Sequence, residues 1–289
     1  MTKTVLGIIG GSGVYDVPME NASWRRLASP WGEASDEVRQ GEINGLPIVF
    51  LPRHGRGHVF SPSSINYRAN IDVLKRCGVT DLFSLSAVGA LKANLPPGTF
   101  VLPDQFLDRT HRRESSFFGT GCVAHVPFGE PTSVVLCEIA AKALKAEKIK
   151  HRAGGTLVVM EGPQFSTCAE SELHRKWGAS LIGMTAMPEA KLAREAELPY
   201  CNIAMVTDFD SWHPHHDGVD VAQVMKVMKA NVENAKRLVL RLAALMPREH
   251  TPCEADHALD FAIMTSPEKR DAALLSKLDA VAGRVMGKP

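Results

Sequence analysis

The sequence VLGIIGGSG at residues 5–13 places a strand-length apolar run directly before a loop of glycines. Such a loop exposes backbone N–H groups, and with the hydroxyl of Ser12 these suit an anion such as phosphate. A tight turn that simply needs glycine is the alternative explanation. The spacing is not GxGxxG, and residues 14–20 contain Pro18 and lack helical periodicity, so a dinucleotide-binding oxidoreductase is disfavoured. A P-loop is excluded because Gly-Lys-Ser/Thr is missing.

Beyond this loop, strand-like and helix-like segments alternate. Short apolar runs of strand length occur at residues 5–9, 48–51, 82–86, 100–102, 156–160, 181–184 and 200–206. Segments with helical periodicity occur at residues 64–77, 132–147, 169–177, 188–196 and 219–245. Several of the strand-like runs are apolar on both faces, as a sheet covered on both sides requires. The alternation predicts an α/β fold, with a mixed central sheet flanked by helices in a single domain.

The end of the chain has a different character. Residues 247–257 are polar and loop-like, whereas residues 264–285 have apolar side chains at helical spacing. We therefore predict one domain at residues 1–246 and a C-terminal appendage at residues 247–289, made of a loop and one helix packed on the same domain.

The composition favours a small-molecule partner. The 289 residues are 45% apolar and 22% charged, and the formal net charge is +1, so no overall field attracts nucleic acid or an anionic membrane. An apolar stretch of about 18 residues, which a membrane span needs, is missing, as are the features of a signal peptide. The six cysteines form no CxxC pair. We therefore expect neither a disulfide framework nor a zinc site, and a cytoplasmic protein.

Two polar segments carry weaker signals. His213, His215 and His216 have the look of a metal cluster, but the intervening proline and the loop setting favour a solvated loop near an active site. We therefore predict no metal site. The charged segment 109–114 predicts a surface or interface strip.

Further motifs follow the glycine loop in order: LPRHGRGH at 51–58, SAVG at 86–89, DQFLDRT at 104–110, MEGPQFS at 160–166, GMTAMPE at 183–189 and VTDFDSW at 206–212. In this order and spacing, from about residue 7 to 245, the set resembles the trimeric purine nucleoside phosphorylase family. The DFD variant resembles its methylthioadenosine phosphorylase branch. The resemblance implies a nucleoside phosphorylase-like fold, a homotrimer, and inorganic phosphate as cosubstrate without a metal or organic cofactor.

A phosphate site is where residue chemistry and this resemblance agree. A dianionic nucleophile needs a cationic fork, which Arg53 can offer, an imidazole N–H from His54, and hydroxyl donors. The resemblance assigns these roles to six positions: Ser12, Arg53, His54, Ser86, Ala87 through its backbone, and Thr185. Without the other motifs, Arg53 and His54 would be equally well explained as a surface basic pair.

A base site depends on Asp208 and Asp210. They end an apolar strand, and a separation of two residues on an extended chain puts both carboxyls on one face. Crowding two carboxyls in a partly buried cleft favours the protonated form of one of them. A protonated carboxyl can donate to purine N7, and a carboxylate can accept from an exocyclic amine. This pattern suits adenine, whereas a 6-oxopurine would prefer an amide donor. Helix-capping or calcium-binding aspartates are the alternative.

The remaining contacts are implied by the resemblance alone. Met184 lies against the ribose, Phe165 covers the base, Phe209 belongs to the substrate site, and Ser166 is linked to base specificity. An apolar pocket for the 5′ substituent is formed by Val221 and Val224, and closed by His125 of a neighbouring subunit.

Together these interpretations predict phosphorolysis of 5′-methylthioadenosine to adenine and 5-methylthioribose 1-phosphate, with Asp208 as the general acid. Activity on adenosine is compatible with the same residues. The alternatives are a 5′-methylthioinosine or 6-oxopurine nucleoside phosphorylase, an NAD-binding oxidoreductase, and a non-catalytic nucleoside-binding protein.

Overall fold

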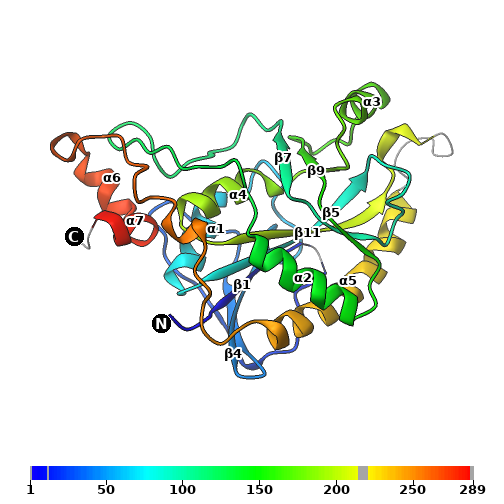
Figure 1. The fold of residues 1–289 in the computed structure, drawn as a ribbon, viewed down its shortest axis with the longest axis horizontal. Helices are drawn as coiled ribbons and strands as arrows, with labels where there is room; N and C mark the ends of the chain where they lie inside the picture. Colours follow the sequence, from blue (N-terminus) through cyan, green and yellow to red (C-terminus); the bar gives the residue numbers. More distant parts are fainter. Residues whose placement is uncertain (1, 12, 214–220, 287–289) are drawn as a thin grey trace.

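The structure is a computed structural model that describes residues 2–11, 13–213 and 221–286, without the side chains of 221–224. In this part of the chain, eleven strands form one mixed sheet, with helices packed on both of its faces (Figure 1). The strands are β1 (Leu6–Gly10), β2 (Glu20–Arg25), β3 (Val38–Ile43), β4 (Leu46–Pro52), β5 (Asp81–Ala90), β6 (Phe100–Leu102), β7 (Gln105–Asp108), β8 (His151–Ala153), β9 (Thr156–Val159), β10 (Leu181–Gly183) and β11 (Tyr200–Asp208). The predicted α/β class with a mixed central sheet is confirmed.

The strands at the centre of the sheet run parallel. β1 pairs in parallel with β4 and with β5, and β5 pairs in parallel with β11 over most of its length. β10 pairs antiparallel with the end of β5. Carboxyl ends of parallel strands lie at one edge of a sheet, and ligands of open α/β sheets bind there. This edge is therefore where a site is expected.

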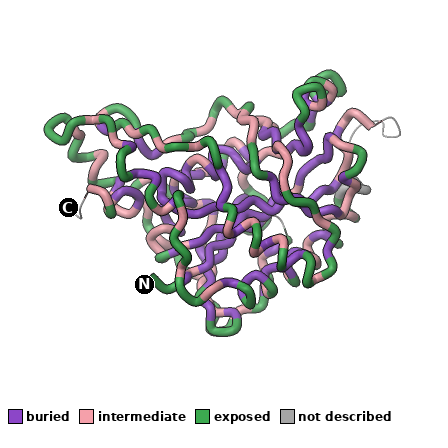
Figure 2. The backbone as a smooth tube through the Cα atoms, in the orientation of Figure 1, coloured by how far each residue is buried: buried purple, intermediate pink, exposed green. Residues whose placement is uncertain are grey.

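Two hydrophobic cores cover the two faces of the sheet. Ile8 and Ile203 belong to the core under α2 and α5, whereas their neighbours Ile9 and Ala204 belong to the core under α1 and α4. Alternate residues of a strand point to opposite faces, so strands covered on both sides must be apolar throughout. The buried backbone forms the middle of the molecule in Figure 2. The helices are α1 (Tyr67–Arg76), α2 (Val134–Ala146), α3 (Cys168–Lys176), α4 (Ala186–Glu195), α5 (Val221–Leu245), α6 (Ala272–Lys277) and α7 (Asp279–Met286).

Four strands were not predicted: β2, β3, β7 and β8. β2, β7 and β8 lie at the margins of the sheet, each paired with a single neighbour. Their sequences are ENASWR, QFLD and HRA, and that of β3 is VRQGEI. Because these strands face solvent on at least part of their surface, they need no apolar run and carry little sequence signal.

The prediction of one terminal helix over residues 264–285 is wrong. The segment contains a short 3-10 helix (Pro267–Lys269), α6 and α7. The side chain of Asp271 accepts a hydrogen bond from the backbone N–H of Leu274, which starts α6 at that point. Asp279 begins α7 and forms a two-bond ion pair with Arg76 of α1. Local caps and this tertiary contact therefore divide the segment.

Charged contacts fasten the C-terminal segment to the body. His250 Nδ1 lies 2.9 Å from Asp81 Oδ2, and Nε2 lies 2.8 Å from Asp256 Oδ1. Hydrogen bonds to Asp256 and Asp81 raise the pKa of His250 to about 10. The imidazolium thus joins the start of β5 to the 3-10 helix Glu254–His257. No helix in the described residues is long and apolar enough to span a membrane.

We expect His250→Gln to lower the free energy of unfolding at pH 6 by about 1.5–3 kcal/mol, because charged hydrogen bonds are lost. The folded pKa of His250, about 10, lies above its ordinary value of 6.5. Its contribution is therefore fully present below pH 6.5 and lost as pH rises towards 10. Denaturant unfolding of both proteins from pH 6 to pH 10 measures this, and the two stability curves must converge at high pH. Curves that stay parallel would contradict the assignment.

Candidate active site

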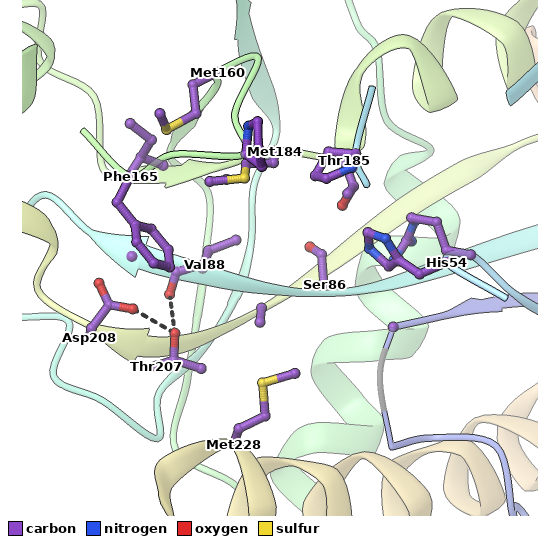
Figure 3. Close-up of a pocket in the computed structure, with 18 of the residues that line it drawn as sticks. His54, Ser86, Val88, Met160, Phe165, Met184, Thr185, Thr207, Asp208 and Met228 are labelled. Atoms are coloured by element: carbon purple, nitrogen blue, oxygen red, sulfur yellow. Dashed lines mark hydrogen bonds between the residues drawn. The ribbon is translucent and has the colours of Figure 1, made fainter. Parts of the chain in front are cut away.

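A cavity of about 480 Å³ opens at the carboxyl edge of the central strands. Each parallel strand contributes to its wall: Gly11 follows β1, Arg53 and His54 follow β4, and Asp208 ends β11. β5 supplies four consecutive lining residues, Ser86 to Gly89. Two loops, 160–165 and 183–185, form much of the remaining wall. Figure 3 shows His54, Ser86 and Thr185 towards one end, and Phe165, Thr207 and Asp208 towards the other.

A buried ion pair lies at the first end. Arg53 is 1% exposed, and its Nε donates to Glu189 Oε2 at 2.8 Å while Nη2 donates to Oε1 at 3.2 Å. Nη1 donates to the carbonyl of Leu85 and Nη2 to the hydroxyl of Ser84. Burial lowers the pKa of Arg53, but the charge of Glu189, its hydrogen bonds and the nearby tyrosines together outweigh burial and raise the pKa above its usual range. The guanidinium is therefore a permanent cation, with a second Nη1 hydrogen left for a ligand.

The Arg53–Glu189 pair continues into a network that reaches Ser86. Glu189 also accepts hydrogen bonds from the hydroxyls of Ser84 and Tyr200. The amide nitrogen of Asn202 lies 3.2 Å from the hydroxyl oxygens of both Ser84 and Ser86. Asn202 thus orients the Ser86 hydroxyl, which lines the cavity.

His54 lines the same end of the cavity. Its Nδ1 lies 2.8 Å from the carbonyl oxygen of Phe60, which can only accept, so Nδ1 carries a hydrogen. Burial, and then the charge of Arg53, lower the pKa of His54 to about 4. The ring is therefore neutral near pH 7, and Nε2 presents a lone pair. In this state Nε2 can accept a hydrogen from a monoprotonated phosphate.

Thr185 and Ala87 also line this end of the cavity. Thr185 is the N-terminal cap residue of α4, but its side chain makes no capping hydrogen bond, so the hydroxyl is available to a ligand. Ser12 lies outside the described residues. The described part of the predicted anion site thus comes together from β4, β5 and the start of α4.

At the other end, Asp208 is held by two neighbours. Asp210 N donates to Asp208 Oδ1 at 2.8 Å, and the Thr207 hydroxyl lies 2.7 Å from Asp208 Oδ2 (Figure 3). The same hydroxyl lies 3.2 Å from the carbonyl of Val88. A hydroxyl has one hydrogen, so when Thr207 donates it to Val88, its oxygen can accept a proton held by Asp208 Oδ2. This arrangement accommodates both protonation states of Asp208.

Asp210 lines the same end and is 4% exposed. Its Oδ2 is buried without a hydrogen-bond partner. A buried acceptor without a donor is costly, and such atoms occur where a ligand completes the bonding. An exocyclic amine is a donor of the required kind.

Three large apolar side chains line the cavity between its two ends: Met160, Phe165 and Met184. Phe165 and Met184 were predicted as substrate contacts, and Met160 begins the motif at 160–166. Phe165 is 51% exposed, so part of its ring is free to cover a ligand. Met228 of α5 closes the opposite side of the cavity.

Several predicted residues do not line this cavity. Phe209 stacks on His213 and contacts Trp212. The predicted extended chain through both carboxyls is wrong, because β11 ends at Asp208, Phe209 has φ −102° and ψ 18°, and Asp210 begins the 3-10 helix Asp210–Trp212. Ser166 is buried beside Met160. His125 is exposed, and its backbone N–H donates to Ala262 in the C-terminal segment. The side chains of Val221 and Val224 lie outside the described residues.

Of the three histidines considered as metal ligands, His215 and His216 lie outside the described residues. Within the described ranges, no group of three metal-ligating side chains comes together.

Four residues of the site had no role predicted from the sequence: Glu189, Asn202, Thr207 and Met228. Glu189 and Thr207 lie inside quoted motifs, and a buried arginine requires a carboxylate partner, which pointed to an acidic residue. Met228 follows Val221 and Val224 at helical spacing, which pointed to the same face. Asn202 carried no signal, because it lies in the middle of an apolar strand.

Comparison with known proteins gives consistent matches. The family model described as "Phosphorylase superfamily" matches residues 5–244. S-methyl-5′-thioadenosine phosphorylase of Bradyrhizobium diazoefficiens is 63% identical over 289 residues, which covers 99% of each chain. A methylthioadenosine phosphorylase from an antarctic soil metagenomic library is 41% identical with a TM-score of 0.92, covering 97% of this chain and 99% of that one. The Schistosoma mansoni enzyme in complex with adenine is 36% identical with a TM-score of 0.81, covering 84% and 92%.

We expect Glu189→Gln to lower the free energy of unfolding by about 3–5 kcal/mol, because it leaves the buried Arg53 cation without its carboxylate. Glu172→Gln is the matched control. It removes a carboxylate from a half-exposed ion pair with Arg175, so a change below about 0.5 kcal/mol is expected. Equilibrium denaturation measures both, and equal effects would refute a special role for Glu189.

Proposed function

The chain belongs to the phosphorylase superfamily, and we propose that it cleaves 5′-methylthioadenosine with inorganic phosphate to give adenine and 5-methylthioribose 1-phosphate. The observation that carries the proposal is that one cavity joins an anion site to a pair of carboxyls. The anion site has the buried Arg53 and the hydroxyls of Ser86 and Thr185. The carboxyls of Asp208 and Asp210 lie at the opposite end, where a purine base would be bound.

Phosphate binds between Arg53, His54, Ser86 and Thr185. Arg53 supplies the positive charge and the hydroxyls donate hydrogen bonds, while His54 Nε2 accepts the hydrogen of a monoprotonated phosphate. The backbone N–H groups of Gly11, Ala87 and the adjoining loop, and the hydroxyl of Ser12, add further donors. The network through Glu189 and Asn202 holds these groups in place before the ligand arrives.

The reaction forms a bond between a phosphate oxygen and C1′ of the sugar, while the bond between C1′ and N9 breaks. Its electron pair passes into the purine ring, and N7 takes a proton from Asp208, so adenine leaves neutral. The sugar passes through an oxocarbenium-like state, whose positive charge the adjacent phosphate stabilises. Afterwards the N–H of Asp210 and the hydroxyl of Thr207 stabilise the new Asp208 carboxylate.

Selection of adenine depends on Asp210. Its unpartnered Oδ2 accepts from the 6-amino group, whereas a 6-oxo group would place an acceptor against an acceptor. This favours 5′-methylthioadenosine over 5′-methylthioinosine and other 6-oxopurine nucleosides. An apolar 5′ pocket distinguishes the methylthio group from a hydroxyl by only about 1–3 kcal/mol, so adenosine is a slower substrate.

The remaining assignments follow from the family resemblance. The resemblance assigns a 5′ pocket to Val221 and Val224, and Met228 of the same helix lines the cavity. His125, which does not line the cavity of its own chain, closes that of a neighbour in a cytoplasmic homotrimer. Ser166, whose hydroxyl contacts the sulfur of Met160, influences base specificity. Residues 1–246 form the phosphorylase domain and residues 247–289 an appendage to it. The enzyme uses phosphate as cosubstrate with no cofactor, and acts on small molecules rather than nucleic acids.

The decisive experiment is adenine release from 5′-methylthioadenosine with and without phosphate. We expect release only with phosphate, and Asp208→Ala to lower kcat by about 10²–10⁴. The KM for phosphate is expected to change less than about threefold, because Asp208 lies at the other end of the cavity. Binding without release would instead indicate a nucleoside-binding protein, and near-wild-type turnover of the variant would exclude Asp208 as the acid.

Asp210→Asn is expected to shift base preference towards hypoxanthine, because the new amide can donate to O6. The ratio of kcat/KM for 5′-methylthioadenosine to that for 5′-methylthioinosine falls by about 10–200-fold. Asp210→Ala is the control, since it removes the acceptor without adding a donor and lowers the ratio less. If Asp210→Asn left the preference for adenine over hypoxanthine unchanged, Asp210 would not select the base.

A further inference from the structure

The side chain of Arg113 is buried, contrary to the predicted surface or interface strip at residues 109–114. Its side chain is 1% exposed, whereas those of Arg112 and His111 are 63% and 70% exposed. Arg113 does not line the cavity. Its Nε makes no hydrogen bond but lies 3.5 Å from Glu161 Oε1 in an ion pair. Burial of the charge is compensated by this carboxylate and by the partners of the two Nη atoms, and the identity of those partners indicates the role of Arg113.

The guanidinium of Arg113 binds backbone carbonyls from two separate loops. Nη1 donates to the carbonyl oxygens of Met184 at 2.5 Å and Met187 at 2.6 Å. Nη2 donates to those of Glu161 at 2.7 Å and Met160 at 3.4 Å. Four carbonyl dipoles therefore converge on one cation. The contact with Glu161 has the length of a charge-assisted hydrogen bond, and those with Met184 and Met187 are shorter.

A reciprocal contact fixes the segment that carries Arg113. The carboxylate of Glu161 accepts the backbone N–H groups of His111 at 2.7 Å and Arg112 at 3.4 Å, and the hydroxyl of Ser63. Burial raises the pKa of Glu161, but the hydrogen bond from Ser63 and these further contacts outweigh it and hold the pKa at about 2. The carboxylate thus stays charged at any physiological pH. Residues 111–113 therefore both donate hydrogen bonds to Glu161 through their backbone and bind its carbonyl through Arg113.

The two loops so joined are the walls of the cavity. One carries Met160, Pro163 and Phe165, and the other carries Met184 and Thr185. They lie in direct contact, since a Cβ atom added to Gly162 would sit 2.5 Å from the sulfur of Met184. A change in their spacing would move the base-covering and sugar-contacting side chains and Thr185, but would leave Arg53 and His54, which follow β4, and Ser86 of β5 in place.

We propose that Arg113 is a positioning residue that sets the spacing of these two loops, and thereby the affinity for the nucleoside. This inference rests on the proposed phosphorolysis at the same site. Only a guanidinium spans both pairs of carbonyls, because its two Nη atoms point in different directions, whereas a lysine presents one nitrogen.

The test compares Arg113→Met, Arg113→Lys and Arg112→Met. Steady-state kinetics with 5′-methylthioadenosine and phosphate are measured for each, together with direct binding of 5′-methylthioadenosine by calorimetry in the absence of phosphate. We expect Arg113→Met to raise the KM and Kd for the nucleoside at least tenfold. The KM for phosphate rises less, because Thr185 is the only predicted phosphate donor in these two loops and Arg53, His54 and Ser86 keep their places. Arg113→Lys recovers part of the nucleoside affinity, and Arg112→Met stays within twofold of wild type.

Two outcomes overturn the proposal: wild-type nucleoside affinity in Arg113→Met, or equal losses for nucleoside and phosphate, which a purely structural role would give. If Arg113→Met does not fold, Arg113→Lys tests the proposal. Unchanged nucleoside affinity in that variant would show that a guanidinium with two Nη donors is not needed. The proposed function fails separately, if wild type binds the nucleoside but releases no adenine with phosphate. The calorimetric comparison of the variants still tests Arg113 in that case.

Discussion

Beneath the anion end of the cavity, Arg53 and Glu189 form an ion pair from which water is almost entirely excluded. Removing two charges from water costs several kcal/mol each, so such a pair is stable only when its remaining hydrogen-bonding groups are also satisfied. Here Ser84 of β5, Tyr200 of β11 and the carbonyl of Leu85 supply those bonds. The pair therefore links the end of β4, the middle of the sheet and α4, and it places a cation where the cavity begins.

The chemistry of the site follows from strand direction. The carboxyl ends of neighbouring parallel strands meet at one edge, so residues far apart in sequence come together there, on the strands and on the loops that follow them. Donors for an anion follow β4 and begin α4, while acidic groups end β11. In the proposed reaction the nucleoside lies in the cavity between them, whose two ends differ in charge. A proton can therefore be delivered at one end while negative charge is held at the other.

Segments outside the sheet serve the site indirectly. Residues 109–114 join the two loops that wall the cavity, and the chain then continues to His125, whose backbone is paired with the C-terminal segment at Ala262. That segment is in turn fastened by His250, and by Arg284, which pairs with Glu197. The appendage thus supports the stretch of chain that carries His125.

The sequence by itself determined the α/β class, the central strands and the family, because burial on both faces requires apolar runs and because the site motifs keep their order. It also indicated Asp208 and Asp210, since two carboxyls after one strand have few structural uses.

Only the tertiary structure decided which polar and charged side chains form pairs. Arg53 and Glu189 lie 136 residues apart, and nothing local distinguishes buried Arg113 from exposed Arg112. The hydrogen on Nδ1 of His54 is likewise decided by the carbonyl of Phe60, and the break in the terminal helix by contacts such as Arg76 with Asp279. Periodicity reports which face of an element is buried, but a polar partner is chosen by where the folded chain places its opposite charge.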